Sequence, residues 1–99
     1  MAIHKTARFQ VRAEALEKCK QAIQEFVQHI HDHEPGTQIY ISLQQKDGPT
    51  QFIHYMVFKD DEAEKKHAES NAVKRFVEVL YPNCVSPVEF TDYDAFASR

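Results

Sequence analysis

The segment Phe52–Phe58 constrains the fold most, because it is apolar or aromatic on both sides of an extended chain. In a strand, successive side chains point to opposite faces of the sheet. Both faces of this strand therefore require cover by other parts of the molecule. One face carries Phe52, His54, Met56 and Phe58, and the other carries Ile53, Tyr55 and Val57.

Changes of hydrophobic period define the elements before this strand. Lys5–Arg12 alternates between apolar and polar residues, which predicts a strand. The apolar residues that follow have helical spacing, and Pro35 ends the predicted helix. Gln38–Gln44 alternates again, and the turn signal Asp47-Gly48-Pro49 joins it to the doubly apolar strand as a hairpin.

A second helical region and a last strand follow. Asp60 or Asp61 can cap the helical region, and a break is expected near Ser70, because serine favours helix caps. The last strand is predicted over Val85–Tyr93. Pro87 inside it indicates an edge position or a bulge, because proline cannot donate to a strand ladder.

The order strand, helix, strand, strand, helix, strand is the split βαβ arrangement of ferredoxin-like α+β folds, with helices on one face of an antiparallel sheet. Residues 1–99 are expected to form one domain, because a chain of 99 residues cannot divide its apolar side chains between two cores. The helices leave the second sheet face open. A second copy of the chain is the simplest cover, so we expect a homodimer whose two sheets close into an α+β barrel.

Composition limits the function classes. Lysine and arginine number 12 against 15 aspartates and glutamates, so the basic face of a nucleic-acid binder is not expected. No apolar run approaches the roughly 20 residues that span a bilayer, and Met1–Lys5 lacks a signal sequence, so we expect a cytoplasmic protein without a membrane partner. Cys19 and Cys84 are expected to stay reduced.

Four segments and the last strand carry a family resemblance: Glu34–Tyr40, Pro49–Tyr55, Phe58–Ala63, His67–Ser70 and Val88–Tyr93. Their most specific parts are Glu34-Pro35-Gly36 before the second strand and a helical His67 followed by Ser70. Over nearly its whole length the chain resembles the antibiotic-biosynthesis monooxygenase family. The resemblance implies a dimeric α+β barrel with a pocket between sheet and helices. It also implies, for several members, oxygenation of quinols or polycyclic phenols without metal or flavin.

The chain departs from the family at Met56, where members commonly carry a glutamate two residues before an aromatic, here Phe58. If that carboxylate accepts a proton in relatives, this chain lacks it. A non-catalytic binding or dimerisation module is therefore the alternative function, and isomerase or decarboxylase chemistry ranks third. Other members of the family degrade haem, but the resemblance disfavours that reaction here, because the chain has no tryptophan and no asparagine among Ala2–Val11, where haem-degrading relatives place theirs.

Two histidines are the candidate catalytic residues. Cofactor-free oxygenation requires a group that removes a phenolic proton near neutral pH, which favours histidine. His67 matches the helix histidine of the family, although its polar neighbours are also typical of a surface residue. His54 lies among apolar residues, where a core histidine with a hydrogen-bond partner is the competing interpretation.

The candidate substrate-binding residues are two hydroxyls, one cation and two apolar side chains: Tyr40, Tyr55, Arg8, Met56 and Phe58. Tyrosine hydroxyls can orient a phenolic oxygen, and arginine can stabilise a phenolate. If Gln44 pairs with Phe52, Tyr40 shares a sheet face with His54. A slip of one residue separates them, and the sequence does not choose between the two registers.

His29 and His33 are four residues apart on one helical face, a spacing that can chelate a transition metal. The segment is also a helix end, where cationic side chains are expected, and no third ligand can be located. No metal site is therefore expected, and the family resemblance implies that no other cofactor is needed. The expected partner is a small aromatic or quinol-like molecule.

Overall fold

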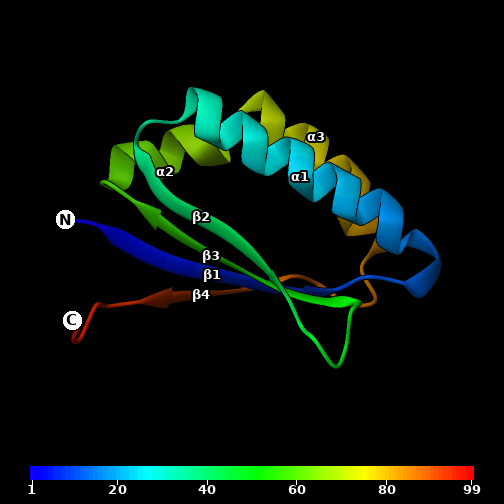
Figure 1. Ribbon diagram of the computed structural model, residues 1–99. Coiled ribbons are helices and arrows are strands. Elements are labelled where there is room, and N and C mark those ends of the chain that lie inside the picture. The colour runs from blue at the N-terminus through cyan, green and yellow to red at the C-terminus, as the bar shows by residue number, and fades with distance from the viewer.

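The computed structural model describes residues 1–99 and shows the predicted α+β ferredoxin-like fold. Four antiparallel strands form one sheet in the order β2-β3-β1-β4, and the helices lie on one of its faces (Figure 1). The strands are β1 (Ile3–Gln10), β2 (Thr37–Gln44), β3 (Gln51–Phe58) and β4 (Glu89–Tyr93). The helices are α1 (Leu16–His33), α2 (Asp61–Ala68) and α3 (Asn71–Leu80), with short 3₁₀ turns at Ala13–Ala15 and Tyr81–Asn83.

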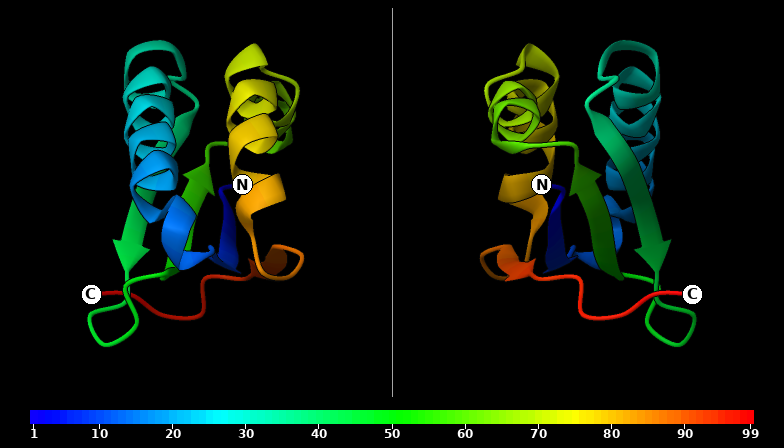
Figure 2. Two further views of the ribbon diagram at one scale, coloured as in Figure 1. Left: turned by 90° about the vertical axis from the view of Figure 1, so that its right-hand side faces the viewer. Right: turned by 90° about the vertical axis from the view of Figure 1, so that its left-hand side faces the viewer.

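The hydrophobic core lies between the helices and the sheet. Seen end-on, α1 and α3 run side by side over the strands (Figure 2). Phe26 of α1 stacks on Phe76 of α3 with ring centroids 4.4 Å apart, and Phe9 of β1 stacks on Phe52 of β3 at 5.4 Å. The first pair joins the two helices and the second joins two strands, and Phe26 links the layers by meeting Tyr40 of β2 edge-on at 5.4 Å.

Side-chain caps separate α2 from α3 as predicted. The Asp60 carboxylate accepts a hydrogen bond from the backbone N–H of Ala63, and the Ser70 hydroxyl accepts one from Val73. Each cap satisfies an N–H group that the first helical turn leaves unpaired. The caps fix where α2 begins and ends over the sheet.

The hairpin register that the sequence left open is settled. Gln44 pairs with Phe52, and Ser42 pairs with His54. Tyr40 therefore lies on the same sheet face as His54, beneath the helices. A β-bulge between Thr37 and Ile39 adds one residue to β2 at its start, next to the end of α1.

The last strand is shorter than predicted. It begins at Glu89 rather than Val85, and it is an edge strand, as Pro87 indicates. Between the 3₁₀ turn at Tyr81–Asn83 and β4, the only strand pairing is an isolated bridge between Cys84 and Val11. Pro87 lacks the N–H that a continuous ladder would need, so the strand forms only after it.

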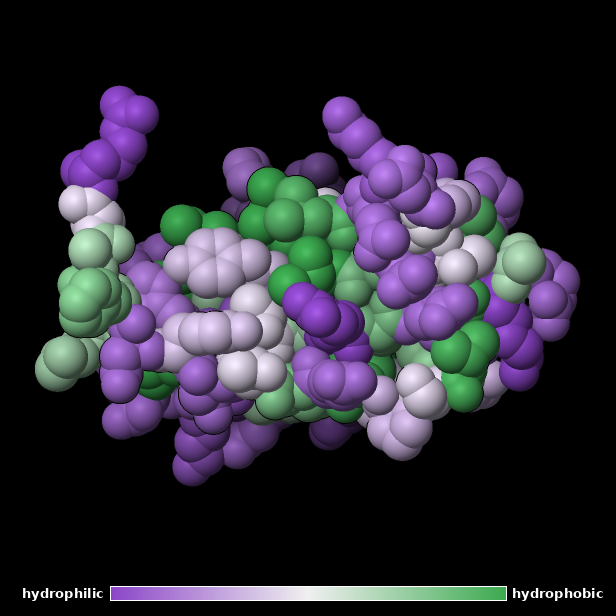
Figure 3. Space-filling view, turned by 90° about the horizontal axis from the view of Figure 1, so that it is seen from below, coloured by the Kyte–Doolittle hydropathy of each residue, from purple (hydrophilic) through white to green (hydrophobic).

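The sheet face opposite the helices carries exposed apolar side chains. Ile39, Ile41 and Leu43 of β2 each keep 44–47% of their surface exposed. Hydrophobic side chains gather over the middle of this face, among hydrophilic ones (Figure 3). None of the helices combines the length and the apolar character that crossing a membrane requires.

Candidate functional site

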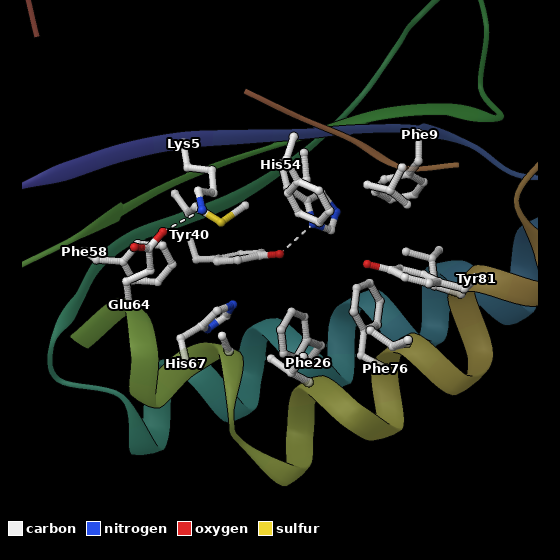
Figure 4. A pocket seen from close by; sticks show the side chains of 18 of the residues that line it. Lys5, Phe9, Phe26, Tyr40, His54, Phe58, Glu64, His67, Phe76 and Tyr81 are labelled. Atoms are coloured by element: carbon white, nitrogen blue, oxygen red, sulfur yellow. Dashed lines mark hydrogen bonds and ion pairs between the residues drawn. The ribbon is translucent and has the colours of Figure 1, made fainter. Parts of the chain in front are cut away.

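A cavity of about 460 Å³ lies between the sheet and the helices α2 and α3. Fourteen of its 19 lining residues are hydrophobic, so it suits an aromatic ligand better than a charged one. Close up, the side chains of Tyr40, His67 and Tyr81 point into it from different elements (Figure 4).

Five of the seven predicted site residues line this cavity together: Tyr40, His54, Met56, Phe58 and His67. The other two, Tyr55 and Arg8, lie on the opposite sheet face and do not line it. Tyr55 alternates with His54 along β3, and its hydroxyl lies 2.8 Å from Nδ1 of His4. Arg8 is exposed and pairs with Ile53 across the sheet.

His67 is held by a carboxylate. Its Nδ1 atom lies 2.8 Å from Oε1 of Glu34, and each of these two side chains keeps 12% of its surface exposed. The Thr37 hydroxyl donates to the same oxygen at 2.9 Å. A carboxylate only accepts hydrogen bonds, so the Nδ1 atom of His67 carries the hydrogen. In the neutral ring, Nε2 is then the acceptor, and it has no protein partner.

The position of His67 depends on a close approach of two segments. Gly36 follows the end of α1, and a Cβ atom there would lie 2.7 Å from Cβ of Ala63 in α2. The Lys59 N–H also donates to the carbonyl of Gly36 at 2.8 Å. Ala63 and His67 are four residues apart, so they share one face of α2. This contact brings His67 within reach of Glu34.

A second polar pair lies on the sheet side of the cavity. Oη of Tyr40 lies 2.8 Å from Nδ1 of His54, which keeps only 1% of its surface exposed. Burial lowers the pKa of His54 to about 4, so its ring is neutral at physiological pH. Burial, with a smaller contribution from the nearby Glu34 carboxylate, raises the pKa of Tyr40 well above its ordinary value.

The two histidines differ in access to the cavity. Nε2 of His54 is fully covered and has no hydrogen-bond partner, so this ring contacts the cavity mainly through Tyr40. A ring nitrogen of His67 is directed into the open space beneath Tyr40 (Figure 4). Tyr40 packs against both rings, with centroids 5.3 Å from His54 and 5.7 Å from His67. The two histidines therefore share one tyrosine as their neighbour.

Sequence reasoning missed several residues of the site. Glu34 stood in the family-like motif but received no role. An acidic residue at the C-terminal end of a helix opposes the helix dipole, and that mismatch was the available signal. Lys5 lies on the apolar side of β1 and pairs at the cavity rim with Glu64, at 2.6 Å, and with Asp92, at 3.5 Å. Tyr81 gave no sequence signal.

No group of three or more histidine, cysteine, aspartate or glutamate side chains has a geometry that could hold a metal ion. The His29 and His33 rings do lie close together, with centroids 4.6 Å apart. They lie near the end of α1, and neither lines the aromatic cavity.

Comparison with solved structures shows the same fold in distant relatives. A Bacteroides thetaiotaomicron protein assigned to the antibiotic biosynthesis monooxygenases superposes with a TM-score of 0.91 at 19% identity, over 97% of this chain and 90% of that one. A Nitrosomonas europaea protein of the same assignment superposes with a TM-score of 0.86 at 22% identity, over 96% of this chain and 90% of that one. SnoaB, described as a cofactor-independent oxygenase from Streptomyces nogalater, superposes with a TM-score of 0.83 at 14% identity, over 98% of this chain and 95% of that one.

Among curated proteins, none matches this sequence. The sequence profile of one family, described as antibiotic biosynthesis monooxygenase, matches residues 2–79 and so spans β1 to the last turn of α3, including the Glu34–His67 and Tyr40–His54 pairs. The chain therefore belongs to the antibiotic biosynthesis monooxygenase family.

Proposed function

We propose that this protein is a cofactor-independent monooxygenase of a quinol or polycyclic phenol, with His67 as the proton acceptor. The observation that carries the proposal is that His67, which lines the apolar cavity, is held through its Nδ1 atom by Glu34, which does not line it. A carboxylate that holds one imidazole nitrogen leaves the other as a base and stabilises the imidazolium that forms. Family membership and the fold shared with SnoaB support the same reaction class.

The reaction balances without an external reductant when the substrate is a dihydric phenol. A substrate hydroxyl gives its proton to Nε2 of His67, and the phenolate transfers electrons to dioxygen as a carbon–oxygen bond forms. The imidazolium returns the proton to the peroxide. Loss of the ring hydrogen and cleavage of the O–O bond then leave one oxygen on carbon and release the other as water. The substrate supplies all four electrons and becomes a hydroxyquinone.

The other lining residues serve binding in this proposal. Met56 and Phe58 are buried beneath the cavity and offer an apolar surface to a ring. Tyr40 orients the reacting oxygen, and His54 acts through Tyr40 as a positioning residue. Met56 supplies no proton acceptor where relatives commonly carry glutamate, so the base in this chain is on α2 rather than on β3.

We also propose a homodimer that covers the open sheet face. Ile39, Ile41 and Leu43 form an exposed apolar row there, and Tyr55 and Arg8 belong to the same face. Two such faces in contact would remove apolar surface from water, which is the main favourable term in association. Tyr55 and Arg8 are then interface residues rather than residues of the cavity.

Oxygen uptake tests the proposed reaction. Chelator-treated protein is supplied with a panel of hydroquinones and polycyclic phenols, and uptake is compared with that of His67→Ala. The matched control is His31→Ala, which removes a histidine whose side chain is 81% exposed on α1. We expect uptake by wild type and control, and a loss of about 100-fold or more in His67→Ala.

The alternative, a binding module without catalysis, is favoured by Met56 at the position where relatives commonly carry glutamate. Tight binding of a phenol without conversion, equal in wild type and His67→Ala, would establish the module and contradict the monooxygenase.

A further inference from the structure

The hydrogen atoms of the two polar pairs determine which ligands the cavity accepts. A neutral imidazole has one donor nitrogen and one acceptor nitrogen. For His54, a hydrogen on Nδ1 would leave Nε2 as a bare lone pair enclosed by apolar atoms. It would also leave the hydroxyl hydrogen of Tyr40 without a protein partner. Two buried groups would then be unpaired.

The other tautomer leaves fewer groups unpaired. The Tyr40 hydroxyl then donates to Nδ1, and Nε2, which carries the hydrogen in this tautomer, lies on the side of Phe9 (Figure 4). The rings of Phe9 and His54 meet at 82° with centroids 5.0 Å apart, and an aromatic face is a weak acceptor for N–H. Tyr40 has thus given its only hydrogen to His54. Its oxygen presents lone pairs alone to the cavity.

His67, like Tyr40, presents a hydrogen-bond acceptor to the cavity. Its Nδ1 hydrogen is given to Glu34, so Nε2 faces the cavity as an acceptor. Two lysines line the cavity: Lys5 is held by Glu64 and Asp92, and Lys65 is exposed to solvent. The hydroxyl of Tyr81, which points into the cavity and makes no hydrogen bond to the protein, can act in either role. Oη of Tyr40 and Nε2 of His67, two polar atoms that face the space between sheet and helices, are therefore both acceptors.

We infer that this cavity selects ligands by hydrogen-bond donation: it binds the reduced, dihydroxy form of an aromatic compound and disfavours the quinone. A hydroxyl group donates to Tyr40 or His67, whereas a quinone carbonyl would set its lone pairs against theirs. The inference rests on the proposed function for the identity of the ligand. It adds that each substrate hydroxyl that is oxidised to a carbonyl loses the hydrogen bond it donated in the site, which weakens the binding of the product.

Binding without oxygen tests the inference separately from turnover. Three probes are titrated anaerobically at about pH 8, where free imidazole is neutral: 2,3-dimethyl-1,4-dihydroxynaphthalene, its dimethyl ether and 2,3-dimethyl-1,4-naphthoquinone. The ring methyl groups hinder addition of the Cys84 thiol to the quinone. We expect the dihydroxy compound to bind ~10- to 100-fold more tightly than the other two. Equal or tighter binding of the quinone, or no binding of any probe, would overturn the inference.

Two variants distinguish an effect of hydrogen-bond polarity on ligand preference from an effect of packing in the cavity. His54→Leu frees the Tyr40 hydroxyl to donate, so the preference for the dihydroxy compound should fall by ~10-fold while the quinone binds more tightly. Tyr40→Phe removes one acceptor and should weaken the dihydroxy compound alone, and it serves if His54→Leu does not fold. An unchanged preference in either folded variant would contradict the assigned hydrogen positions. Absence of oxygen uptake in wild type would remove the proposed reaction but leave the order of affinities intact.

Discussion

Nδ1 of His67 lies 2.8 Å from Oε1 of Glu34, and the two residues are 33 positions apart in the chain. The pair joins the end of α1 to α2 and holds the ring of His67 against the aromatic cavity, which Glu64, Lys65 and Ala68 of α2 also line. Thr37 donates to the same carboxylate oxygen from the start of β2. Three elements therefore fix one imidazole, as a general base requires.

Glu34→Gln should lower kcat about tenfold or more and change KM little. The amide keeps the size of the side chain but removes the charge that stabilises the imidazolium. Steady-state oxygen uptake over a range of substrate concentrations measures kcat and KM separately. Glu69→Gln, an exposed carboxylate at the end of α2, is the control and should behave as wild type. A change confined to KM would show that Glu34 has no role in the chemical step.

Gly36→Ala should destabilise the protein by about 1–3 kcal/mol and lower activity, because the new Cβ would overlap that of Ala63. Urea unfolding and oxygen uptake give the two readouts. The double variant Gly36→Ala, Ala63→Gly moves the methyl group to the other partner and should recover activity, with Ala63→Gly alone as reference. No recovery would mean that the contact does not position His67.

Stability should fall as the pH falls from about 6.5 to 4, because burial lowers the pKa of His54 to about 4. An unfolded chain takes up a proton at the ordinary histidine pKa, roughly 6.5, before the folded protein does, so acid favours unfolding. The stabilisation is complete at pH values above the pKa of the unfolded chain, and it is lost as the pH falls towards the pKa of the folded protein. We expect a loss of about 2 kcal/mol between pH 7.5 and pH 5.

Urea titrations at the two pH values measure this loss, and His54→Leu supplies the comparison. The free energy of unfolding of this variant should lack the part of the pH dependence that comes from His54. The same slope in both proteins would show that His54 is not the group that titrates.

Ile41→Glu should weaken the proposed dimer, because a carboxylate would be buried in the apolar row of the open sheet face. Sedimentation velocity over a range of concentrations should show monomer where wild type is dimeric. Gln24→Glu makes the same charge change on an exposed position of α1 and should stay dimeric. Wild type that sediments as a monomer at all concentrations would contradict the interface.

The fold could be predicted because its signals are local. The double-faced apolar segment Phe52–Phe58, the cap at Asp60 and the break at Ser70 each depend on residues a few positions apart. The hairpin register could not be predicted, because the loop between Gln44 and Gln51 is too long to fix the pairing. That register decides whether Tyr40 meets His54, so half of the site depended on it.

Strand alternation alone separates Tyr55 and Arg8 from the cavity. Arg8 alternates with Ala7 and Phe9, which point beneath the helices, and Tyr55 alternates with His54 in the same way. Chemical reactivity favoured both residues, but their position in the pleat places them on the other face. Glu34 is the converse case, because its partner lies on another helix and no local pattern links the two.

The most direct test of the account is labelling with ¹⁸O₂ in the presence of a chelator. Wild type supplied with an accepted hydroquinone should yield hydroxyquinone that carries one ¹⁸O atom, with the second atom in water, and His67→Ala should form it about 100-fold more slowly or less. Labelled product formed at the same rate by both proteins, or product whose added oxygen comes from water, would contradict the account.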